Sequence, residues 1–356
     1  MAKPSVLIMA AGTGGHVFPA LACARQFQQQ GYDVHWLGTP TGIEHELTQH
    51  AGISMHCIQM SGLRGKGLAR LLGMPWQLFK AILQARQVIK KVQPVCVVGF
   101  GGYVTVPGGV AAKLGGVPLV IHEQNAIAGT ANKSLLPFAQ LVCEGFPNTF
   151  KAQPKVCFTG NPVREDLLML KRQLSAGTGV NLLVLGGSLG AEPLNKLLPE
   201  AVQLLADPAQ LTIRHQAGKQ HAAITQQRYQ ALGLTAEVQP FISDMAAAYA
   251  WADLVICRAG ALTVSELAAV GVGAFLIPLP HAIDDHQSKN AAFLAEQGAA
   301  KLLPQRSTTA EGLAAQLTEV LMNKHHLLEM GQIAASLAKP TATQEVVRKC
   351  LEVAHG

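Results

Sequence analysis

Several segments of this chain combine glycine with polar side chains directly after a run of apolar residues. The first, Ala11-Gly12-Thr13-Gly14-Gly15-His16, separates the apolar run 6–10 from a helical stretch that is expected to begin at about Pro19. A helix start offers unpaired N–H groups and a positive dipole end, and glycine lets an anion approach the backbone closely. The segment predicts a phosphate-type loop, although a purely structural turn has the same composition.

Two common nucleotide sites do not fit this loop. Gly12 and Gly14 match the start of G-x-G-x-x-G, but Val17 stands where the last glycine belongs. No acidic residue closes the second predicted strand at Leu37-Gly38, where dinucleotide-binding enzymes hold the ribose. The loop also lacks the Lys-Ser/Thr pair of a P-loop. We therefore expect neither a dinucleotide site nor an NTPase site.

Two further glycine-rich segments follow predicted strands. One is 99–107, Gly-Phe-Gly-Gly-Tyr-Val-Thr-Val-Pro, which contains Tyr103. The other is 186–190, Gly-Gly-Ser-Leu-Gly, in which the hydroxyl of Ser188 is a suitable donor to a phosphate. Three loops of this kind in one chain favour a phosphate-bearing ligand over chance turns.

Two polar segments follow later strands. In 258–266, Arg-Ala-Gly-Ala-Leu-Thr-Val-Ser-Glu, Thr263 or Ser265 is a candidate helix cap. Glu266 is expected in the first helical turn, either because a carboxylate is favoured there or because it accepts two ribose hydroxyls. In 281–290, His-Ala-Ile-Asp-Asp-His-Gln-Ser-Lys-Asn, the spacing is no recognisable metal-ligand set, and the Asp pair also suits helix capping. Since the chain has no D-x-D motif either, we expect no metal and no other cofactor.

The elements that must position these segments alternate between short apolar strands and helical stretches, which is typical of a parallel doubly wound sheet. The pattern restarts at Asn181, so we predict an α/β protein of two Rossmann-like domains that face each other across a cleft. Gly160, Asn161 and Pro162 mark the break. The predicted domains are 1–162 and 163–340. Ligands of such sheets bind beyond the carboxyl ends of the strands, where the loops lie.

Composition and charge narrow the class. Of 356 residues, 49% are hydrophobic and 14% charged, which suits two sizeable cores. Seven scattered Cys without a C-x-x-C motif indicate reduced thiols in a cytosolic protein. The N-terminal apolar run is too short for a signal peptide, and no run approaches the length of a membrane span. The stretch 47–122 has no Asp or Glu but eight Lys and Arg, so an anionic partner is expected there.

Taken in order, A-G-T-G-G-H, G-F-G-G-Y-V-T-V-P, H-E-Q-N-A, G-N-P-V-R, G-G-S-L-G-A, R-A-G-A-L-T-V-S-E and D-D-H-Q span essentially the whole chain. Together they resemble the MurG family of bacterial peptidoglycan glycosyltransferases. The resemblance implies the GT-B fold and an inverting transfer of N-acetylglucosamine (GlcNAc) from UDP-GlcNAc. The acceptor would be the C4 hydroxyl of the N-acetylmuramyl sugar of lipid I, undecaprenyl-pyrophosphoryl-MurNAc-pentapeptide, and the product lipid II.

The resemblance also implies which residues bind substrates. Arg164 and Ser188 would stabilise the departing UDP, Glu266 would hold the ribose, and the backbone of Ile242 would read uracil. Gln287 and Asn125 would orient the sugar. The other donor-binding residues that the resemblance implies are Thr13, Gly14, Gly15, Ala261, Leu262, Thr263, Val264 and Ser265, and Tyr103 is a further implied substrate-binding residue.

His16 is the first choice for a general base on the acceptor hydroxyl, because its reference pKa lies near neutrality. A hydrogen bond that only shapes the loop is the alternative role for His16. Glu123 is the second candidate for the base.

An acceptor with a polyprenyl tail would explain why the stretch 47–122, which lacks Asp and Glu, combines basic residues with bulky apolar ones. Within 68–83, Trp76, Phe79 and Leu83 share one helical face with Lys and Arg nearby, while Leu78, Ile82 and Ile89 form a second stripe. One stripe is needed for the core of the domain. The other predicts a patch on the protein that binds an anionic membrane surface. The resemblance implies a peripheral protein on the cytoplasmic face of the inner membrane, with cell-wall synthesis and division proteins as partners. The helix expected at 341–356 would pack back on the first domain.

Three alternatives remain open from the residues. A related GT-B enzyme with another glycolipid acceptor shares the donor loops. A nucleotide-sugar epimerase shares the fold. A nucleic-acid-binding module is disfavoured, because the basic stretch lacks regularly spaced aromatic residues and no nucleic-acid motif occurs.

Overall fold

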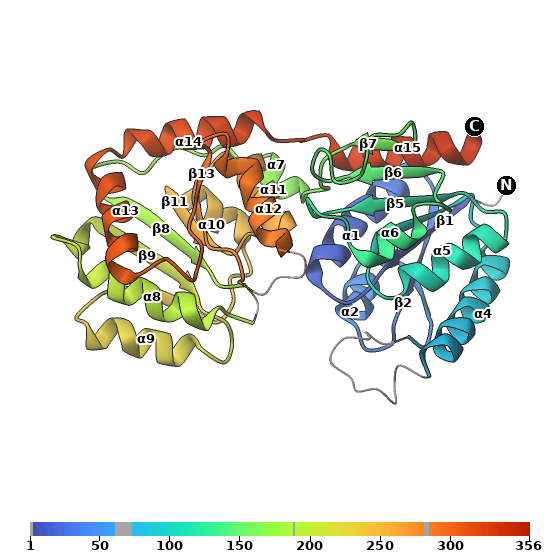
Figure 1. Cartoon of the computed structure of the whole chain (residues 1–356), viewed down its shortest axis with the longest axis horizontal. Coiled ribbons are helices and arrows are strands. Elements are labelled where there is room, and N and C mark those ends of the chain that lie inside the picture. The colour runs from blue at the N-terminus through green and yellow to red at the C-terminus, as the bar shows by residue number, and fades with distance from the viewer. Residues whose placement is uncertain (1–2, 61–72, 188, 281–284) are drawn as a thin grey trace. The chain divides into compact units, whose positions relative to one another are not determined.

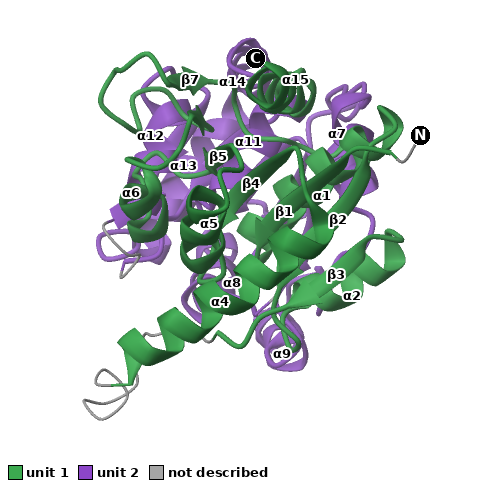
Figure 2. Ribbon diagram, turned by 90° about the vertical axis from the view of Figure 1, so that its right-hand side faces the viewer, with its two compact units in different colours: residues 1–164, 339–356 green, residues 165–338 purple. Residues whose placement is uncertain are grey.

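The computed structural model describes residues 3–60, 73–187, 189–280 and 285–356 (Figure 1). The chain divides into two compact units. Unit 1 comprises Met1–Arg164 and Lys339–Gly356, and unit 2 comprises Glu165–Ala338 (Figure 2). Each unit contains one parallel sheet, so the prediction of two Rossmann-like α/β domains is confirmed.

Unit 1 is built on a seven-stranded parallel sheet in the order β3-β2-β1-β4-β5-β6-β7. The central strands are buried along nearly their whole length, as in sheets covered by helices on both faces. The strands are β1 (Ser5–Ala10), β2 (Asp33–Gly38), β3 (Ser54–Cys57), β4 (Cys96–Gly101), β5 (Leu119–Glu123), β6 (Leu141–Glu144) and β7 (Val156–Phe158). The helices are α1 (Gly14–Gln29), α2 (Ile43–His50), α4 (Met74–Val92), α5 (Thr105–Leu114), α6 (Thr130–Leu135) and α15 (Ala342–His355).

Unit 2 is built on a six-stranded parallel sheet in the order β10-β9-β8-β11-β12-β13. Its strands are β8 (Val180–Leu185), β9 (Leu211–Gln216), β10 (Glu237–Gln239), β11 (Leu254–Cys257), β12 (Gly273–Leu276) and β13 (Ala300–Leu302). Its helices are α7 (Glu165–Leu168), α8 (Glu192–Gln203), the 3₁₀ turn η1 (Pro208–Gln210), α9 (Ala222–Ala231), α10 (Met245–Trp251), α11 (Ala261–Val270), α12 (His286–Ala295), α13 (Ala310–Met322) and α14 (His325–Ser336).

Helix α15 belongs to unit 1 although it ends the chain. Val346, Val347 and Cys350 are fully buried in the core that α1 forms with the sheet. Figure 1 shows α15 beside β6, and the Tyr32 hydroxyl lies 3.0 Å from His355 Nε2. The apolar stripe of α15 thus covers one face of the unit 1 sheet.

The described helices include none that is both long enough and apolar enough to span a membrane.

Candidate active site

The loops after β1 and β4 meet at the carboxyl edge of the unit 1 sheet. β1 and β4 are hydrogen-bonded neighbours, yet β2 and β3 come between them in sequence. Open α/β sheets bind ligands at such a switch point, because the loops on its two sides diverge. The first glycine loop and Gly102–Val104 therefore border the place where a ligand is expected in unit 1.

His16 lies in the first turn of α1, which begins at Gly14 rather than at about Pro19 as the sequence predicted. The glycine loop is thus itself the start of the helix. The imidazole is hydrogen-bonded to the backbone of Ala11, and its Nδ1 lies 3.5 Å from Thr13 Oγ1. The ring packs against Gly101, where an added Cβ would lie only 2.7 Å from His16 Cδ2.

The environment of His16 suits a proton acceptor. Burial lowers the pKa of its imidazole below the ordinary value of 6.5, and the Glu123 carboxylate and the hydrogen bond to Ala11 oppose that shift. A histidine with a lowered pKa is neutral at pH 7, so one ring nitrogen carries a lone pair. His16 therefore has the protonation state that a general base requires.

The second glycine-rich segment is shorter as a loop than the sequence predicted. Gly99–Gly101 lies within β4, and Thr105–Pro107 lies within α5. Gly101 and Gly102 have φ angles of 106° and 84°, which favour glycine. A Cβ at Gly102 would collide with the carbonyl oxygen of Ala11. These glycines make room for His16 and the first loop, and they place Tyr103 beside Gly12.

Glu123, the last residue of β5, is held by four donors. One carboxylate oxygen accepts from the backbone N–H of Asn125 at 3.1 Å and from its side-chain amide at 3.2 Å. The other accepts from Gly129 N and from the Asn132 amide, both at 2.9 Å. Because both oxygens already accept two hydrogen bonds, this geometry favours a positioning role for Glu123 over that of a base.

His122 was assigned no role from the sequence, yet it is fully buried beside this site. Its Nε2 donates to Gly160 O at 3.0 Å, and the Gln124 amide donates to its Nδ1 at 3.0 Å. Burial lowers the pKa of His122 to about 4. A neutral His122 thus anchors β5 to Gly160, near the end of the first segment of unit 1.

In unit 2 the corresponding switch point lies between β8 and β11. The loop 186–190 follows β8, and Ser188 lies outside the described residues. Gly190 has a φ of 80°, and a Cβ there would collide with the carbonyl oxygen of Ala217. Glycine is therefore required where this loop crosses the end of β9.

Helix α11 begins at Ala261, one residue after Gly260, and no side chain caps it. The predicted caps are wrong for this reason, and Ser265 Oγ instead donates to Ala261 O at 3.0 Å. Glu266 also lies beyond the first turn, contrary to the prediction, because the helix starts earlier than expected. Its carboxylate accepts from the Tyr249 hydroxyl at 3.1 Å. Residues 261–265 thus form the uncapped start of this helix.

The remaining predicted donor residues in unit 2 are held by side chains or backbone. The N–H of Ile242 donates to Gln216 Oε1 at 2.9 Å, which leaves its carbonyl as the group for reading a base. Gln287 Oε1 accepts from Leu279 N at 2.9 Å, which directs the side chain toward the loop after β12.

Arg164 is half-buried and is the last residue of the first segment of unit 1. Residues 281–284 lie outside the described part, and Asp285 stands before α12 with a φ of 54° and accepts from Ser288 Oγ at 2.7 Å. Among the described residues, no group of three or more His, Cys, Asp or Glu side chains could hold a metal ion.

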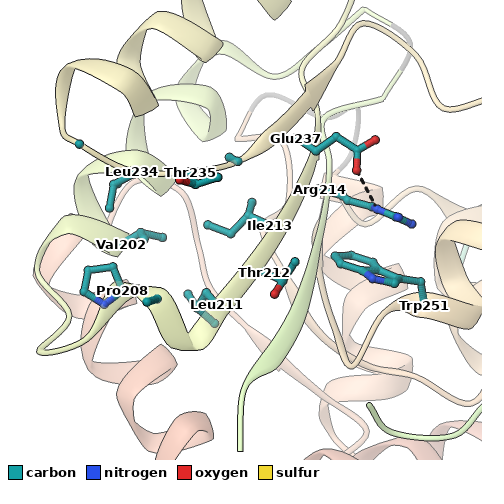
Figure 3. A pocket seen from close by; sticks show the side chains of 13 residues that line it. Val202, Pro208, Leu211, Thr212, Ile213, Arg214, Leu234, Thr235, Glu237 and Trp251 are labelled. Carbon is teal, nitrogen blue, oxygen red and sulfur yellow. Dashed lines mark hydrogen bonds and ion pairs between the residues drawn. The ribbon is translucent and has the colours of Figure 1, made fainter. Parts of the chain in front are cut away.

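A separate cavity of about 480 Å³ lies in unit 2 at the start of β9 (Figure 3). Arg214 stacks on Trp251 at 4.2 Å and pairs with Glu237 at 2.9 Å along its rim. The loops after β8 and β11 lie at the opposite, carboxyl edge of the sheet. This cavity is therefore not the candidate donor site.

An apolar surface lies on α4. Ala81, Ala85 and Ile89 form the stripe of this helix that is buried in the core. Trp76 and Phe79 remain 60% and 50% exposed and stack on each other at 5.7 Å. We call the exposed side chains of Trp76, Phe79 and Leu83 the α4 patch; the basic Lys80 lies beside it, with its Nζ 5.2 Å from the centroid of the Trp76 ring.

Both halves of the chain match models of one enzyme family. Residues 6–144 match the glycosyltransferase family 28 N-terminal domain, and residues 181–346 match the glycosyltransferase family 28 C-terminal domain. The chain belongs to glycosyltransferase family 28. The two matches fall in unit 1 and unit 2, apart from the start of α15, and family 28 membership makes the chain a glycosyltransferase of the GT-B fold type.

Individual relatives agree with the family 28 assignment. A protein from Pseudomonas paraeruginosa, UDP-N-acetylglucosamine–N-acetylmuramyl-(pentapeptide) pyrophosphoryl-undecaprenol N-acetylglucosamine transferase, is 65% identical over 99% of this chain and 100% of its own length. The crystal structure of MurG from Acinetobacter baumannii has a TM-score of 0.85 and 47% identity, covering 98% of this chain and 100% of that one. A UDP-N-acetylglucosamine 2-epimerase structure from Listeria monocytogenes has a TM-score of 0.69 over 97% of this chain and 95% of that one, but at 15% identity it shows the fold alone.

Proposed function

We propose that this glycosyltransferase moves GlcNAc from UDP-GlcNAc to the C4 hydroxyl of the MurNAc sugar of lipid I and so forms lipid II. The observation that carries the proposal is the 65% identity, over 99% of this chain and 100% of the relative, to an enzyme named for this transfer. The arrangement around His16 supports it, since a neutral histidine at the switch point of unit 1 can activate a hydroxyl.

In the proposed reaction, His16 takes the proton of the acceptor hydroxyl as its oxygen attacks the anomeric carbon. The bond from that carbon to the UDP oxygen breaks, and the configuration inverts because a single displacement occurs from the opposite face. Glu123 acts through charge and position, because a carboxylate near His16 stabilises the imidazolium that forms. Thr13, Gly14, Gly15, Tyr103 and Asn125 would bind sugar hydroxyls beside it.

The donor would be held mainly by unit 2. The uncapped start of α11 offers the backbone N–H groups of its first residues and a positive dipole end to the UDP diphosphate, while the N–H of Val264 already donates to Gly260 O at 2.9 Å. Glu266, oriented by Tyr249, would accept the ribose hydroxyls, and the Ile242 carbonyl would accept the N3–H of uracil. The amide of Gln287 would donate to the sugar. Arg164 and Ser188 would stabilise charge on the leaving UDP.

The α4 patch supports a peripheral location on an anionic membrane. Exposed Trp76 and Phe79 would enter the interface while Lys80 and Arg86 meet the head groups. We infer the cytoplasmic face of the inner membrane as that surface and cell-wall synthesis and division proteins as neighbours, because the acceptor would carry an undecaprenyl chain.

The deciding experiment is transfer of radiolabel from UDP-GlcNAc to a lipid I analogue. We expect labelled lipid II analogue from UDP-GlcNAc and far less product from UDP-glucose or UDP-GalNAc. Transfer to another glycolipid but not to lipid I would contradict the proposed acceptor. Consumption of UDP-GlcNAc without any acceptor would instead indicate an epimerase.

A further inference from the structure

A buried carboxylate supports the first glycine loop from below. Glu44 lies in the first turn of α2, and its side chain is fully buried. Its Oε1 accepts from Thr39 N at 3.1 Å and from Thr39 Oγ1 at 2.8 Å, and its Oε2 accepts from Gly12 N at 3.4 Å. Gly12 itself is exposed. One side of the loop therefore faces solvent while the other rests on Glu44.

The fold makes room for this side chain at two glycines. A Cβ at Gly42 would collide with the Glu44 carboxylate, and a Cβ at Gly38 would lie 3.0 Å from Glu44 Cγ. A buried carboxylate is costly unless hydrogen bonds satisfy it, and here Thr39 and Gly12 supply them. Glu44 is thus enclosed by backbone and is bonded directly to the loop.

The contact between Glu44 and Gly12 also sets where α1 begins. Gly12 has a φ of 100°, and α1 starts two residues later and carries His16 in its first turn. Trp36 Nε1 donates to Ala10 O at 2.9 Å, so the chain just before Gly12 is also held from the β2 side. With Ala10 and Gly12 both fixed, the direction in which the helix leaves the sheet is fixed as well.

The charge of Glu44 bears on what the loop can bind. A phosphate placed on this loop would need backbone N–H groups, and the N–H of Gly12 is already engaged. The negative charge of the Glu44 carboxylate, which lies directly beneath the loop, would also repel a negatively charged phosphate. A neutral sugar hydroxyl meets neither obstacle, so the loop favours a hydroxyl over a phosphate.

We propose that Glu44 is a positioning residue for the transfer reaction. Its carboxylate fixes Gly12 and thereby the turn that carries His16, and its charge keeps phosphate groups out of this loop, where sugar hydroxyls would bind. The inference rests on the proposed function, since it places the loop and His16 at the reaction centre.

The test compares Glu44→Gln with Thr39→Val. In E44Q the amide oxygen can serve the two Thr39 donors, but the NH₂ group then faces the N–H of Gly12 and cannot accept from it. T39V removes one hydrogen bond to the same carboxylate and leaves both its charge and its bond to Gly12, so it controls for a purely structural loss. Glu44→Asp keeps the charge on a shorter side chain, which withdraws it from Gly12.

We expect kcat for GlcNAc transfer to a lipid I analogue to fall about tenfold or more in E44Q and E44D, because the turn that carries His16 is misplaced. T39V should lower the melting temperature but keep kcat within about twofold. Inorganic pyrophosphate should compete with the acceptor severalfold better in E44Q than in wild type, T39V or E44D, since only E44Q has lost the charge.

Equal kcat and equal pyrophosphate inhibition in E44Q and T39V would overturn the proposal. If E44Q does not fold, a wild-type kcat in E44D would overturn it just as well. A wild-type enzyme that is inactive on the lipid I analogue but active on another glycolipid would instead contradict the proposed function, and the same three variants would then be compared on that acceptor.

Discussion

At the scale of single residues, the candidate site depends on His16 and on Glu123, whose carboxylate influences the protonation of the His16 imidazole. His16 comes from the start of α1 and Glu123 from the end of β5, and both sit at the carboxyl edge of the unit 1 sheet. Burial favours the neutral imidazole, and the carboxylate moderates that preference. A base with these two opposing influences can be neutral before the reaction and charged after it.

Replacing His16 by alanine should lower kcat/KM for the lipid I analogue by about 100-fold or more, which is the usual contribution of a general base. In the wild type, the acidic limb of the kcat/KM profile should fall below pH 6.5, because the pKa of His16 is lowered from that value. Steady-state kinetics between pH 5 and pH 8 measure both effects. Activity in H16A within a few-fold of wild type would leave His16 only a role in shaping the loop.

Replacing Glu123 by glutamine should move the same acidic limb to lower pH. The carboxylate raises the pKa of His16, so its loss lets that pKa fall further, and protonation of the base then requires more acid. Glu144→Gln is the matched control. Glu144 is paired in register with Glu123, but its carboxylate accepts from the 148–150 loop, so E144Q should leave the limb in place. An unmoved limb in E123Q would remove Glu123 from this role.

Residue types alone singled out His16 as a candidate base, because it follows a glycine loop and its reference pKa lies near neutrality. They did not indicate Glu44, His122 or Gln216. Each of these is a common polar residue whose function depends on burial against a distant backbone group: Gly12, Gly160 and Ile242 respectively. Such contacts are tertiary, and one sequence contains no local pattern for them.

At the scale of elements, the strands beside the switch points could be predicted and the outer strands could not. The apolar runs at 6–10, 181–185 and 254–257 correspond closely to β1, β8 and β11, because strands buried on both faces are continuously apolar. β3, β7, β10 and β13 have only three or four residues and more exposed side chains. Their pairing comes from the sheet next to them rather than from their own composition.

The first residues of helices α1 and α11 were also predicted wrongly, and both helices carry residues of the candidate site. Helix α1 begins at Gly14, directly after Thr13, and α11 begins at Ala261, directly after Gly260; neither start has a side-chain cap hydrogen bond, so a search for capping side chains places both starts too late. A helix that starts early carries His16 in its first turn and moves Glu266 out of the first turn. Uncapped starts are consistent with N–H groups that are kept for a ligand.

Helix α4 allows a prediction about membranes. Trp76→Glu combined with Phe79→Glu should reduce binding to vesicles of phosphatidylethanolamine and phosphatidylglycerol by about tenfold or more, since two aromatic side chains lose their place in the interface. Leu204→Glu combined with Met322→Glu is the matched control, because these unit 2 side chains are 54% and 84% exposed and the charge change is the same. Co-sedimentation at low and high salt measures the difference. Equal loss in both double variants would show a general charge effect and not a patch.

At the scale of the whole molecule, the two units share one kind of sheet topology. In each, the chain leaves a central strand to one side and returns on the other, and the glycine-rich loops lie where those paths diverge. That duplication could be predicted from the sequence, because the strand-loop-helix pattern restarts at Asn181. Each unit also contains a fully buried neutral histidine, His122 in unit 1 and His215 in unit 2, which the sequence did not reveal.

These two histidines predict how the molecule responds to acid. Burial lowers the pKa of His122 to about 4 and that of His215 to about 3. Because the pKa is lower in the folded state than in the unfolded state, the unfolded state binds more protons below pH 6.5. The stability contributed by each neutral histidine is present above pH 6.5 and is lost as the pH falls, on the order of 2 kcal/mol per histidine by pH 5.

His215→Gln should therefore weaken the acid dependence of unit 2 by about one proton between pH 6.5 and pH 5, even though the variant is less stable at pH 7. The lower stability is expected because His215 bonds Asn195 and Tyr229, each at 3.1 Å, and glutamine cannot hold both in the same geometry. Urea unfolding at several pH values, followed by hydrogen exchange in peptides of β9, measures the slope for unit 2 alone. His325→Gln, at an exposed histidine of the same unit, should leave the slope unchanged. A slope in H215Q equal to that of wild type would mean that other groups cause the acid sensitivity of unit 2.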